Sequence, residues 1–288
     1  MRSVASDGPL CPVCHGQRVV KIDHRRLKRG WHTNVLCRDC GMVFSAPRPP
    51  ARVYEDFYRH EYTSAVYGLS DDPKKIQEIF AWRTRRSLEK IGYFPKLWKK
   101  GMNVLEVGAG IGAFLMALRK RFGCRVFAVE PAPSFVALGR AQGKLLYAPS
   151  TFEEFLRKPP TAFPRKYDAI VLDQMLEHAL DPVTFLMALQ SLLKPEGFLF
   201  ISVPNIAAPK DQRASFFIFE HVSSFSPYPL ATLLLRCGYK VVGMHAEAPG
   251  SLQIVAAPFR STRPMVHPAV IGQPLTAPDI RRGFAALE

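Results

Sequence analysis

A glycine-rich turn between an apolar strand and a helix constrains the fold of this chain more than any other feature. The turn, Gly108-Ala-Gly-Ile-Gly112, follows the apolar run 103–107 and precedes the helical segment 113–122. Glycines have no Cβ atom, so they permit a tight turn and let a ligand approach the backbone beside a helix N-terminus. The turn therefore predicts a strand–loop–helix unit with a ligand at the carboxyl end of its strand.

The same alternation of strands and helices continues along the chain. After the glycine turn, expected strands at 125–130, 144–147, 167–173 and 198–203 alternate with expected helices at 134–142, 151–156 and 181–193, and residues 194–197 form a turn. Segments 240–244 and 251–256 then form a hairpin around Pro249-Gly250. This order predicts an α/β fold, a doubly wound and mainly parallel sheet with an antiparallel last strand.

The glycine turn is compatible with two nucleotide-containing ligands. Gly108, Gly110 and Ala113 satisfy the dinucleotide pattern G-x-G-x-x-G/A, and Glu130 supplies the acidic residue about 20 positions further on. A carboxylate at the tip of the second strand can accept hydrogen bonds from both hydroxyls of a ribose. The glycine spacing alone therefore leaves NAD and S-adenosylmethionine as candidates.

Two pairs of cysteines mark the N-terminal region. Cys11-Pro-Val-Cys14 and Cys37-Arg-Asp-Cys40 are separated by 22 residues, with expected strands at 18–22 and 31–36 between them. Four thiolates at this spacing can close a tetrahedral Zn²⁺ shell without an open position, which indicates a structural zinc ribbon. The alternatives are redox-active cysteine pairs, which lack a thioredoxin-like strand context here, and haem attachment through Cys11 to His15, which leaves the second cysteine pair unexplained.

The charge balance is strongly basic, with 39 Lys and Arg against 24 Asp and Glu. A net charge of +15 attracts polyanions and phosphate-bearing substrates. The basic run His24–Arg29 falls in the expected connecting loop of the ribbon, either as a solvated turn or as a phosphate contact. No apolar run reaches the roughly 18 residues of a membrane helix, and no secretory signal is visible, so we expect a cytoplasmic protein that spans no membrane.

Composition changes divide the chain into four expected regions. Pro-rich residues 46–50 end the ribbon, 1–50, and begin an aromatic and helical linker, 51–101, that could also serve as a lid. Within this linker, apolar periodicity predicts a helix over 75–93. The nucleotide-binding region is 102–256, and the Pro-rich tail 257–288 is expected to be partly disordered.

The central region resembles class I S-adenosylmethionine-dependent methyltransferases. Glu106-Val-Gly-Ala-Gly-Ile-Gly112 is similar to their first motif, E/D-x-G-x-G-x-G. Later segments resemble the loop after their fourth strand and their fifth-strand region: Asp168 to Pro182 with Leu176-Glu-His178, Leu193-Lys-Pro-Glu-Gly197, and Ser202-Val-Pro-Asn205. The resemblance implies S-adenosylmethionine as the cofactor and covers residues 102–256.

The N-terminal region is similar to zinc-containing methyltransferases of sugar and natural-product pathways, including C-methyltransferases of nucleotide-linked deoxysugars. The similarity rests on the cysteine pairs, a Pro-x-Pro segment, the aromatic residues Phe57, Tyr58 and Tyr62, and Glu220-His221 before Ser-Ser-Phe225. Larger members carry a further C-terminal domain, whereas only residues 257–288 follow here. A nucleotide-sugar surface built by that domain is therefore not expected.

The resemblance implies a role for each matching residue. The cofactor-binding residues would be Glu106, Gly108, Gly110, Gly112, Glu130, Asp173 and Gln174, with Thr151 or Phe152 beside the adenine. The catalytic base would be His221, with Glu220 and His178 nearby, since a neutral histidine suits proton abstraction near pH 7. Tyr58 and Tyr62 would contact the substrate, or would simply pack the junction of ribbon and main domain.

These features favour methyl transfer to a small-molecule acceptor, of sugar or natural-product type, by C- or O-methylation. The basic surface would attract a phosphorylated acceptor. The main alternative is an RNA methyltransferase that grips the phosphate backbone with its ribbon. A binding module that retains the cofactor pocket and a dehydrogenase are further alternatives. The acceptor atom and the oligomeric state stay open.

Overall fold

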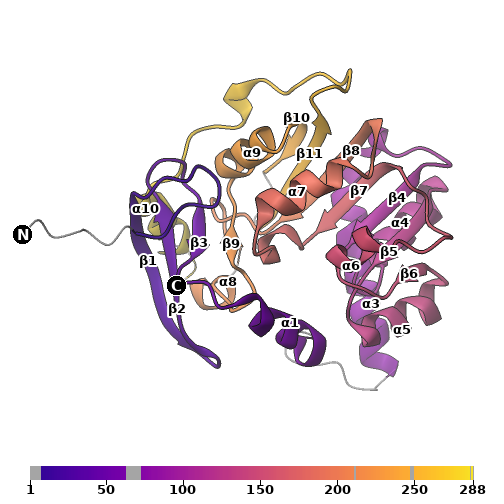
Figure 1. Ribbon diagram of the computed structural model, residues 1–288, viewed down its shortest axis with the longest axis horizontal. Coiled ribbons are helices and arrows are strands. Elements are labelled where there is room, and N and C mark those ends of the chain that lie inside the picture. The colour runs from indigo at the N-terminus through magenta and orange to yellow at the C-terminus, as the bar shows by residue number, and fades with distance from the viewer. Residues whose placement is uncertain (1–7, 63–72, 211, 247–249, 286, 288) are drawn as a thin grey trace, which may run out of the picture.

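Two sheets organise the protein (Figure 1). The computed structural model describes residues 8–62, 73–210, 212–246, 250–285 and 287. A large α/β sheet lies at one end of the molecule and a smaller antiparallel sheet lies at the other (Figure 1). Parts of the expected ribbon (1–7), linker (63–72) and hairpin turn (247–249) lie outside the described residues.

The large sheet has the predicted architecture. Within the described residues its strand order is β10-β11-β8-β7-β4-β5-β6. Strands β4 to β8 are parallel, β11 is antiparallel to β8, and β10 is antiparallel to β11, which confirms the expected closing hairpin. The strands are β4 (Asn103–Val107), β5 (Arg125–Val129), β6 (Leu146–Ala148), β7 (Tyr167–Asp173), β8 (Leu193–Val203), β10 (Tyr239–His245) and β11 (Leu252–Pro258).

Helices cover both faces of this sheet. Successive residues of β4 point to opposite faces, so Val104 packs with Phe114 of α4 while Leu105 belongs to the core that contains Leu186 of α7. No helix in the described part of the chain is long and apolar enough to cross a bilayer. The helices are α1 (Ala51–His60), α3 (Pro73–Gly92), α4 (Ala113–Phe122), α5 (Pro133–Gly143), α6 (Phe152–Arg157), α7 (Pro182–Gln190), α8 (Arg213–Phe216), α9 (Pro227–Arg236) and α10 (Ala277–Ala285). Short 3₁₀ turns are η1 (Pro95–Leu97), η2 (Leu176–His178) and η3 (Pro268–Val270).

Local sequence signals explain where two of these helices begin. Thr151 caps α6 through a reciprocal capping box with Glu154. The Asp181 carboxylate accepts hydrogen bonds from the backbone N–H groups of Val183 and Thr184 at the start of α7, with Pro182 at the first helical position.

Element ends differ from expectation in three places. The expected turn at 194–197 is the start of β8, α7 ends at Gln190 rather than 193, and β6 begins at Leu146 rather than 144. The early part of β8 is a strand because Tyr167 and Leu193 pair across β7 and β8 before a register shift. That pairing is non-local, so the turn-forming residues of this segment did not reveal it.

The smaller sheet contains two strands, β3 and β9, that the sequence did not predict. Its order is β1-β2-β3-β9, in which β9 follows Glu220-His221, far along the chain. The first strand extends to Leu27, so most of the basic run His24–Arg29 is strand rather than the expected loop. The four strands are β1 (Val19–Leu27), β2 (Gly30–Cys37), β3 (Val43–Ser45) and β9 (Ser223–Ser224).

The ribbon and the α/β domain share one hydrophobic core. Met42 and Phe44 of the ribbon belong to the same buried cluster as Leu105 and Phe225. The α1 helix leads from the smaller sheet towards the larger one (Figure 1). Together with the β3–β9 pairing, this continuous core makes the ribbon part of the main fold.

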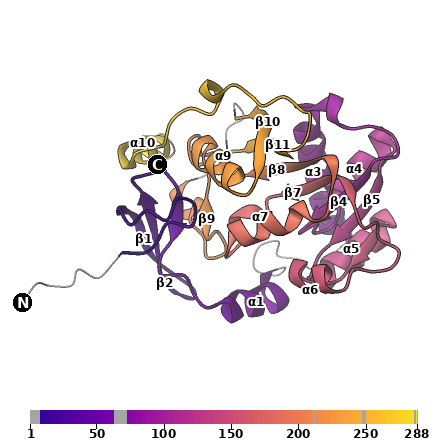
Figure 2. The same ribbon diagram turned by 45° about the horizontal axis from the view of Figure 1, so that its top comes forward.

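The tail forms ordered structure where partial disorder was expected. The α10 helix lies beside the smaller sheet in both views (Figures 1 and 2), and Ile280 and Phe284 are buried with Leu36 and Val43 of that sheet. The reason is that α10 carries an apolar face that the Pro-rich composition of the whole tail hides.

We expect Phe284→Ala to lower the free energy of unfolding by about 3 kcal/mol, because a fully buried aromatic ring leaves a cavity when it is truncated. Phe259→Ala is the matched control, since Phe259 is 54% exposed and its loss should cost little. Denaturant unfolding of both variants measures the difference. Equal stability of the two would show that α10 is not part of the cooperative fold.

Candidate functional site

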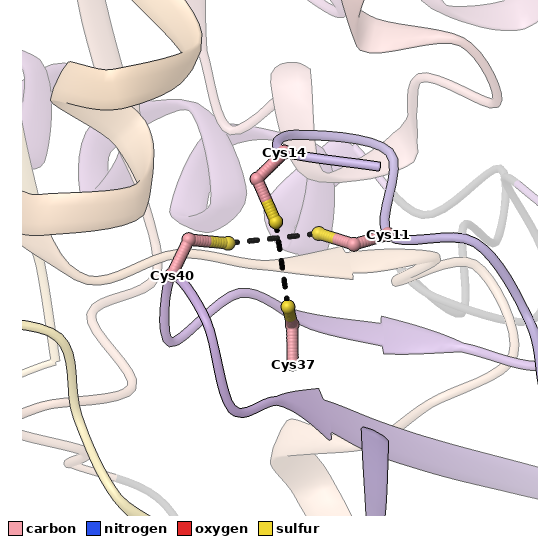
Figure 3. A group of neighbouring side chains, drawn as sticks. All are labelled: Cys11, Cys14, Cys37 and Cys40. Atoms are coloured by element: carbon pink, nitrogen blue, oxygen red, sulfur yellow. Dashed lines mark hydrogen bonds between the residues drawn. The ribbon is translucent and has the colours of Figure 1, made fainter. Parts of the chain in front are cut away.

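The four N-terminal cysteines converge on one point (Figure 3). The Cys11 and Cys40 sulfurs are 3.6 Å apart and those of Cys14 and Cys37 are 3.5 Å apart. In Figure 3 these two lines cross, so the sulfurs form a compact group of four. A zinc–sulfur bond of about 2.3 Å gives tetrahedral edges of about 3.8 Å, close to both distances. The cluster is therefore compatible with a four-sulfur metal site.

Backbone groups support the cysteine cluster from both sides. The N–H groups of Val13 and Gly16 donate to the Cys11 and Cys14 sulfurs at 3.4 Å. Gly41, which follows the last cysteine, has a φ of +72°, and a Cβ atom there would meet the backbone of Leu275 at 2.8 Å. The tail thus packs directly over the second knuckle, at a position that only glycine fits.

The glycine turn at the end of β4 has the conformation that a ligand-binding loop requires. Gly110 has a φ of +52°, and a Cβ atom on it would meet nothing within 4 Å. Gly110 lines a pocket together with Ile111, Phe135 and Arg83. Gly112 differs, because a Cβ atom there would lie 2.2 Å from the Leu145 side chain. Gly110 therefore provides open space for a ligand, while Gly112 provides close packing of the turn.

Two carboxyl groups flank this turn. Glu130 follows β5, and its oxygens accept from the N–H of Gly110 at 2.8 Å and of Ala132 at 2.9 Å. Burial raises the pKa of Glu130 to about 7. Glu106 is fully enclosed, burial raises its pKa well above the usual range, and its Oε2 atom has no hydrogen-bond partner among the described residues. An orphaned buried oxygen beside an open glycine fits a polar cofactor at this edge.

The end of β7 adds an ion pair and a strained residue. Asp173 accepts a hydrogen bond from the Nζ atom of Lys90, which comes from α3. Gln174 follows with a φ of +55°, a left-handed conformation that is uncommon for residues other than glycine. Its Nε2 atom donates to the Ser202 hydroxyl at 3.4 Å. Backbone strain of this kind clusters at binding sites.

Of the two residues expected beside the adenine, neither offers a free side chain. Thr151 is committed to the α6 capping box, and Phe152 is a core residue whose ring packs 4.8 Å from that of Phe185. Phe152 therefore contributes to stability rather than to a ligand contact.

A cluster of aromatic and histidine side chains lies beside the carboxyl edge of the sheet. The Tyr58 hydroxyl is 2.7 Å from Nδ1 of His178. The Tyr62 ring lies edge-on to both His178, at 6.2 Å, and Phe135, at 6.3 Å. Because Phe135 lines the pocket of Gly110, Tyr62 connects the histidines to the glycine turn. Burial raises the pKa of both tyrosines, so their hydroxyls stay protonated at neutral pH.

His221 lies beside His178 in this cluster, with their ring centroids 5.1 Å apart. Its Nδ1 atom is 3.0 Å from the backbone carbonyl of Phe216. A carbonyl only accepts hydrogen bonds, so Nδ1 carries the proton and Nε2 keeps its lone pair. Burial lowers the pKa of His221 to about 4, although the Phe216 carbonyl acts in the opposite direction, so the ring is neutral at pH 7.

Glu220 does not join the histidine pair through its side chain. Its carboxylate lies outside the cluster of Glu177, His178 and His221. Burial raises the pKa of Glu220, and its charge, like that of Glu177, acts on Tyr58 and Tyr62. The structure thus brings Tyr58, Tyr62, His178 and His221 together, with the Glu220 carboxylate outside the histidine group.

Sequence reasoning missed three charged residues of this region. Lys90 and Arg83 were assigned only to a helix before the catalytic domain, yet Lys90 pairs with Asp173 and the charge of Arg83 acts on Glu106 and Glu130. Glu177 was quoted only as part of a motif. Arg83 and Lys90 are seven residues apart, about two helical turns, so they lie on one face of α3. This spacing was the sequence signal that could have indicated a shared role.

Comparison with known proteins agrees with this architecture. The family model described as "Methyltransferase domain" matches residues 79–243, more than half of the chain. The ubiquinone biosynthesis O-methyltransferase of Histophilus somni is 38% identical over 107 residues, which cover 35% of this chain and 44% of that protein. The enzyme of that name from Xanthomonas campestris pv. campestris is 36% identical over 110 residues, 36% of this chain and 44% of that protein. The chain spans less than half the length of these curated relatives.

A solved structure supports the fold. A chain in the complex of the Haloferax volcanii Trm112 methyltransferase activator with a methyltransferase aligns with a TM-score of 0.51 and 17% identity, over 65% of this chain and 94% of that chain. The strand order, the glycine turn and the family match lead to one conclusion. Residues 79–243 carry a class I S-adenosylmethionine-dependent methyltransferase domain, and the chain belongs to the methyltransferase-domain family.

Proposed function

We propose that the protein transfers a methyl group from S-adenosylmethionine to a small-molecule acceptor, with His221 as the general base. The observation that carries this proposal is the fixed tautomer of His221 in a cluster of side chains that Tyr62 connects to the glycine turn. The ubiquinone biosynthesis O-methyltransferases give further support, because their names indicate a small-molecule pathway. The ribbon resemblance favours a sugar or natural-product acceptor, methylated at carbon or oxygen.

The cofactor would be held by the residues at the carboxyl edge of the sheet. Gly108, Gly110 and Gly112 shape the turn, and Glu130, whose oxygens accept from two backbone N–H groups, would bind the ribose hydroxyls. Glu106, Asp173 and Gln174 complete the polar lining. When bound, S-adenosylmethionine supplies an electrophilic methyl group on a sulfonium. The protein's own contribution is to align the reactants, which can supply roughly 7 to 11 kcal/mol of barrier reduction.

His221 would take the acceptor's proton at its Nε2 atom. A general base must be unprotonated and must present a lone pair to the substrate. The Phe216 carbonyl holds the ring in the tautomer that does this, and burial keeps the ring neutral. Tyr58 and His178 form the adjoining wall, and Tyr62 and Glu220 would contact the acceptor as it approaches the methyl group.

RNA is the second candidate acceptor, favoured by the outer face of the β1–β2 hairpin. Trp31 is 68% exposed there and stacks on His24 with ring centroids 4.6 Å apart. Arg26 pairs with Trp31 across the strands, and Lys28 lies in the turn. An exposed ring beside basic side chains can stack a nucleobase and bind its phosphates.

An assay of the acceptor pool separates these candidates. The protein is incubated with cell extract and methyl-labelled S-adenosylmethionine, and the products are then treated with RNase. We expect the label to remain after this treatment and to be found in small molecules. If RNase instead removes the label, and if the label is lower with the Arg26→Gln and Lys28→Gln variants, the acceptor is RNA.

We expect His221→Ala to lower the rate of methyl transfer by roughly 10²- to 10⁴-fold, the contribution of a general base. The affinity for S-adenosylmethionine, measured by calorimetry, should stay near normal because His221 lies outside the glycine turn. His267→Ala is the matched control, since His267 is exposed and only caps η3. Undiminished turnover of His221→Ala would remove the base assignment.

We infer that the four-cysteine cluster holds one structural Zn²⁺. Cys11→Ser should then reduce the zinc content, measured by elemental analysis, well below one per chain, while Cys124→Ser should retain it because Cys124 lies in the core of the α/β domain. Metal loss should also lower methyl transfer, since β3 of the ribbon pairs with β9 beside His221. A full zinc content in Cys11→Ser would contradict the four-sulfur site.

A further inference from the structure

Glu177 is a buried carboxyl group that the mechanism above does not use. It lies in η2, between the end of β7 and α7, and is 1% exposed. Neither of its carboxyl oxygens has a hydrogen-bond partner among the described residues. Burying a polar group without a partner is costly, and such groups in folded proteins call for an explanation.

The groups around Glu177 explain why this carboxyl is buried. A carboxyl oxygen of Glu177 and one ring nitrogen each of His178 and His221 lie within 4.8 Å of one another. The Oε1 atom of Glu177 is 3.8 Å from Nε2 of His178. Nδ1 of His178 faces the Tyr58 hydroxyl instead, so the two nitrogens of that ring have different partners. The orphaned carboxyl thus faces the histidine pair.

Glu220, the acid next to His221 in the sequence, does not face the histidine pair in this way. Its carboxylate is absent from the group of three, although its backbone carbonyl lies within hydrogen-bonding range of the His178 ring. Its side-chain charge acts on Tyr58 and Tyr62, as that of Glu177 also does, so the distance from the histidines is what separates the two acids. Of these two acids, Glu177 is therefore the carboxyl that can respond to a charge on His221.

We propose that Glu177 is the positioning residue of the histidine pair and stabilises the His221 imidazolium that forms during methyl transfer. The proposal rests on the proposed function. In the step, Nε2 of His221 gains the acceptor's proton. The electron pair of the broken O–H or C–H bond forms the new bond to the methyl carbon, and the pair of the broken C–S bond stays on sulfur. The positive charge left on His221 is then balanced by the Glu177 carboxylate.

The charged groups around Glu177 make this response dependent on pH. Burial raises the pKa of Glu177 to about 8, the charge of Asp173 acts in the same direction, and the charge of Lys90 opposes them. His178, His221, Tyr58 from α1 and Tyr62, which follows α1, are the other titratable groups near it. The carboxyl is therefore mostly protonated at pH 7 and becomes charged as the pH rises through about 8. Its stabilising effect on an imidazolium grows over the same interval.

Nuclear magnetic resonance of the ring nitrogens tests the proposal without an acceptor. In protein labelled with ¹⁵N-histidine, we expect the His178 and His221 ring resonances to show an inflection near pH 8. The inflection should disappear in Glu177→Gln and persist in Glu177→Asp, which keeps a carboxyl group. It should also persist in Glu196→Gln, the matched control, because Glu196 lies near the start of β8, at the opposite end of the strands. Glu130→Gln checks that the carboxyl with a pKa of about 7 is not the source.

A kinetic arm distinguishes this inference from the proposed function. Using the acceptor pool and labelled S-adenosylmethionine, Glu177→Gln should slow methyl transfer by roughly 10- to 10⁴-fold, as for other carboxyls that support a histidine base. The rise in rate of the unmodified protein between pH 7 and 9 should be lost, and cofactor affinity should be unchanged.

Three results would overturn the inference. The first is the absence of an inflection in the unmodified protein, which needs no variant to fold. The second is an inflection that survives in a folded Glu177→Gln protein. The third is a second equivalent of Zn²⁺ or Mn²⁺, bound by the unmodified protein and lost in Glu177→Gln, because it would identify the three groups as metal ligands. A failure of the proposed function appears separately, as undiminished methyl transfer by His221→Ala.

Discussion

The pairing of β3 with β9 is the contact on which the histidine site depends. Phe44 pairs with Ser223, and the N–H of Ser45 donates to the carbonyl of Val222 at 3.1 Å, joining residues 177 positions apart. His221 immediately precedes this strand. Since each backbone N–H and C=O must find a partner when buried, the pairing holds the segment before β9 in one place. The ribbon is therefore tied to the position of His221 and is not a separate attachment to the α/β domain.

The C-terminal helix α10 also packs against the segment that carries His221. The Phe284 ring packs 5.4 Å from that of Phe216, whose carbonyl fixes the tautomer of His221. Gly41 lets the tail approach the cysteine knuckle directly. The small sheet and α10 thus both contact one short segment, 216–224. A small ribbon with little core of its own gains rigidity from these contacts, and a metal held by the four cysteines would add to it.

The other half of the site depends on burial of carboxyl groups at the edge of a parallel sheet. Glu106, Glu130 and Glu177 are all less than one-tenth exposed, and burial raises the pKa of each. Lys90 enters this region from α3 and pairs with Asp173. A dry site strengthens every remaining electrostatic interaction, which suits a reaction in which charge moves from a sulfonium to a base.

Most of the larger fold could be read from the sequence because its signals are local. The glycine turn, the acid at the end of β5 and the helix starts at Thr151 and Asp181 each act within a few residues of one another. The cysteine cluster could also be predicted from the sequence, since a four-sulfur site requires a fixed spacing within each cysteine pair. The tail was misjudged because its average composition hides the apolar face of α10.

By itself, the sequence determined the strand–turn–helix order, the cofactor loop, the cysteine cluster and the identity of the two histidines. Only the tertiary structure decided which acid faces them. Glu220 is next to His221 in sequence, but its carboxylate lies outside the group of three, whereas Glu177 reaches the histidines across the fold. The physical reason is that β9 pairs with a strand far away in the chain and that side chains of neighbouring residues need not point the same way. Contacts of this kind are set by packing, and packing leaves no periodic trace in the sequence.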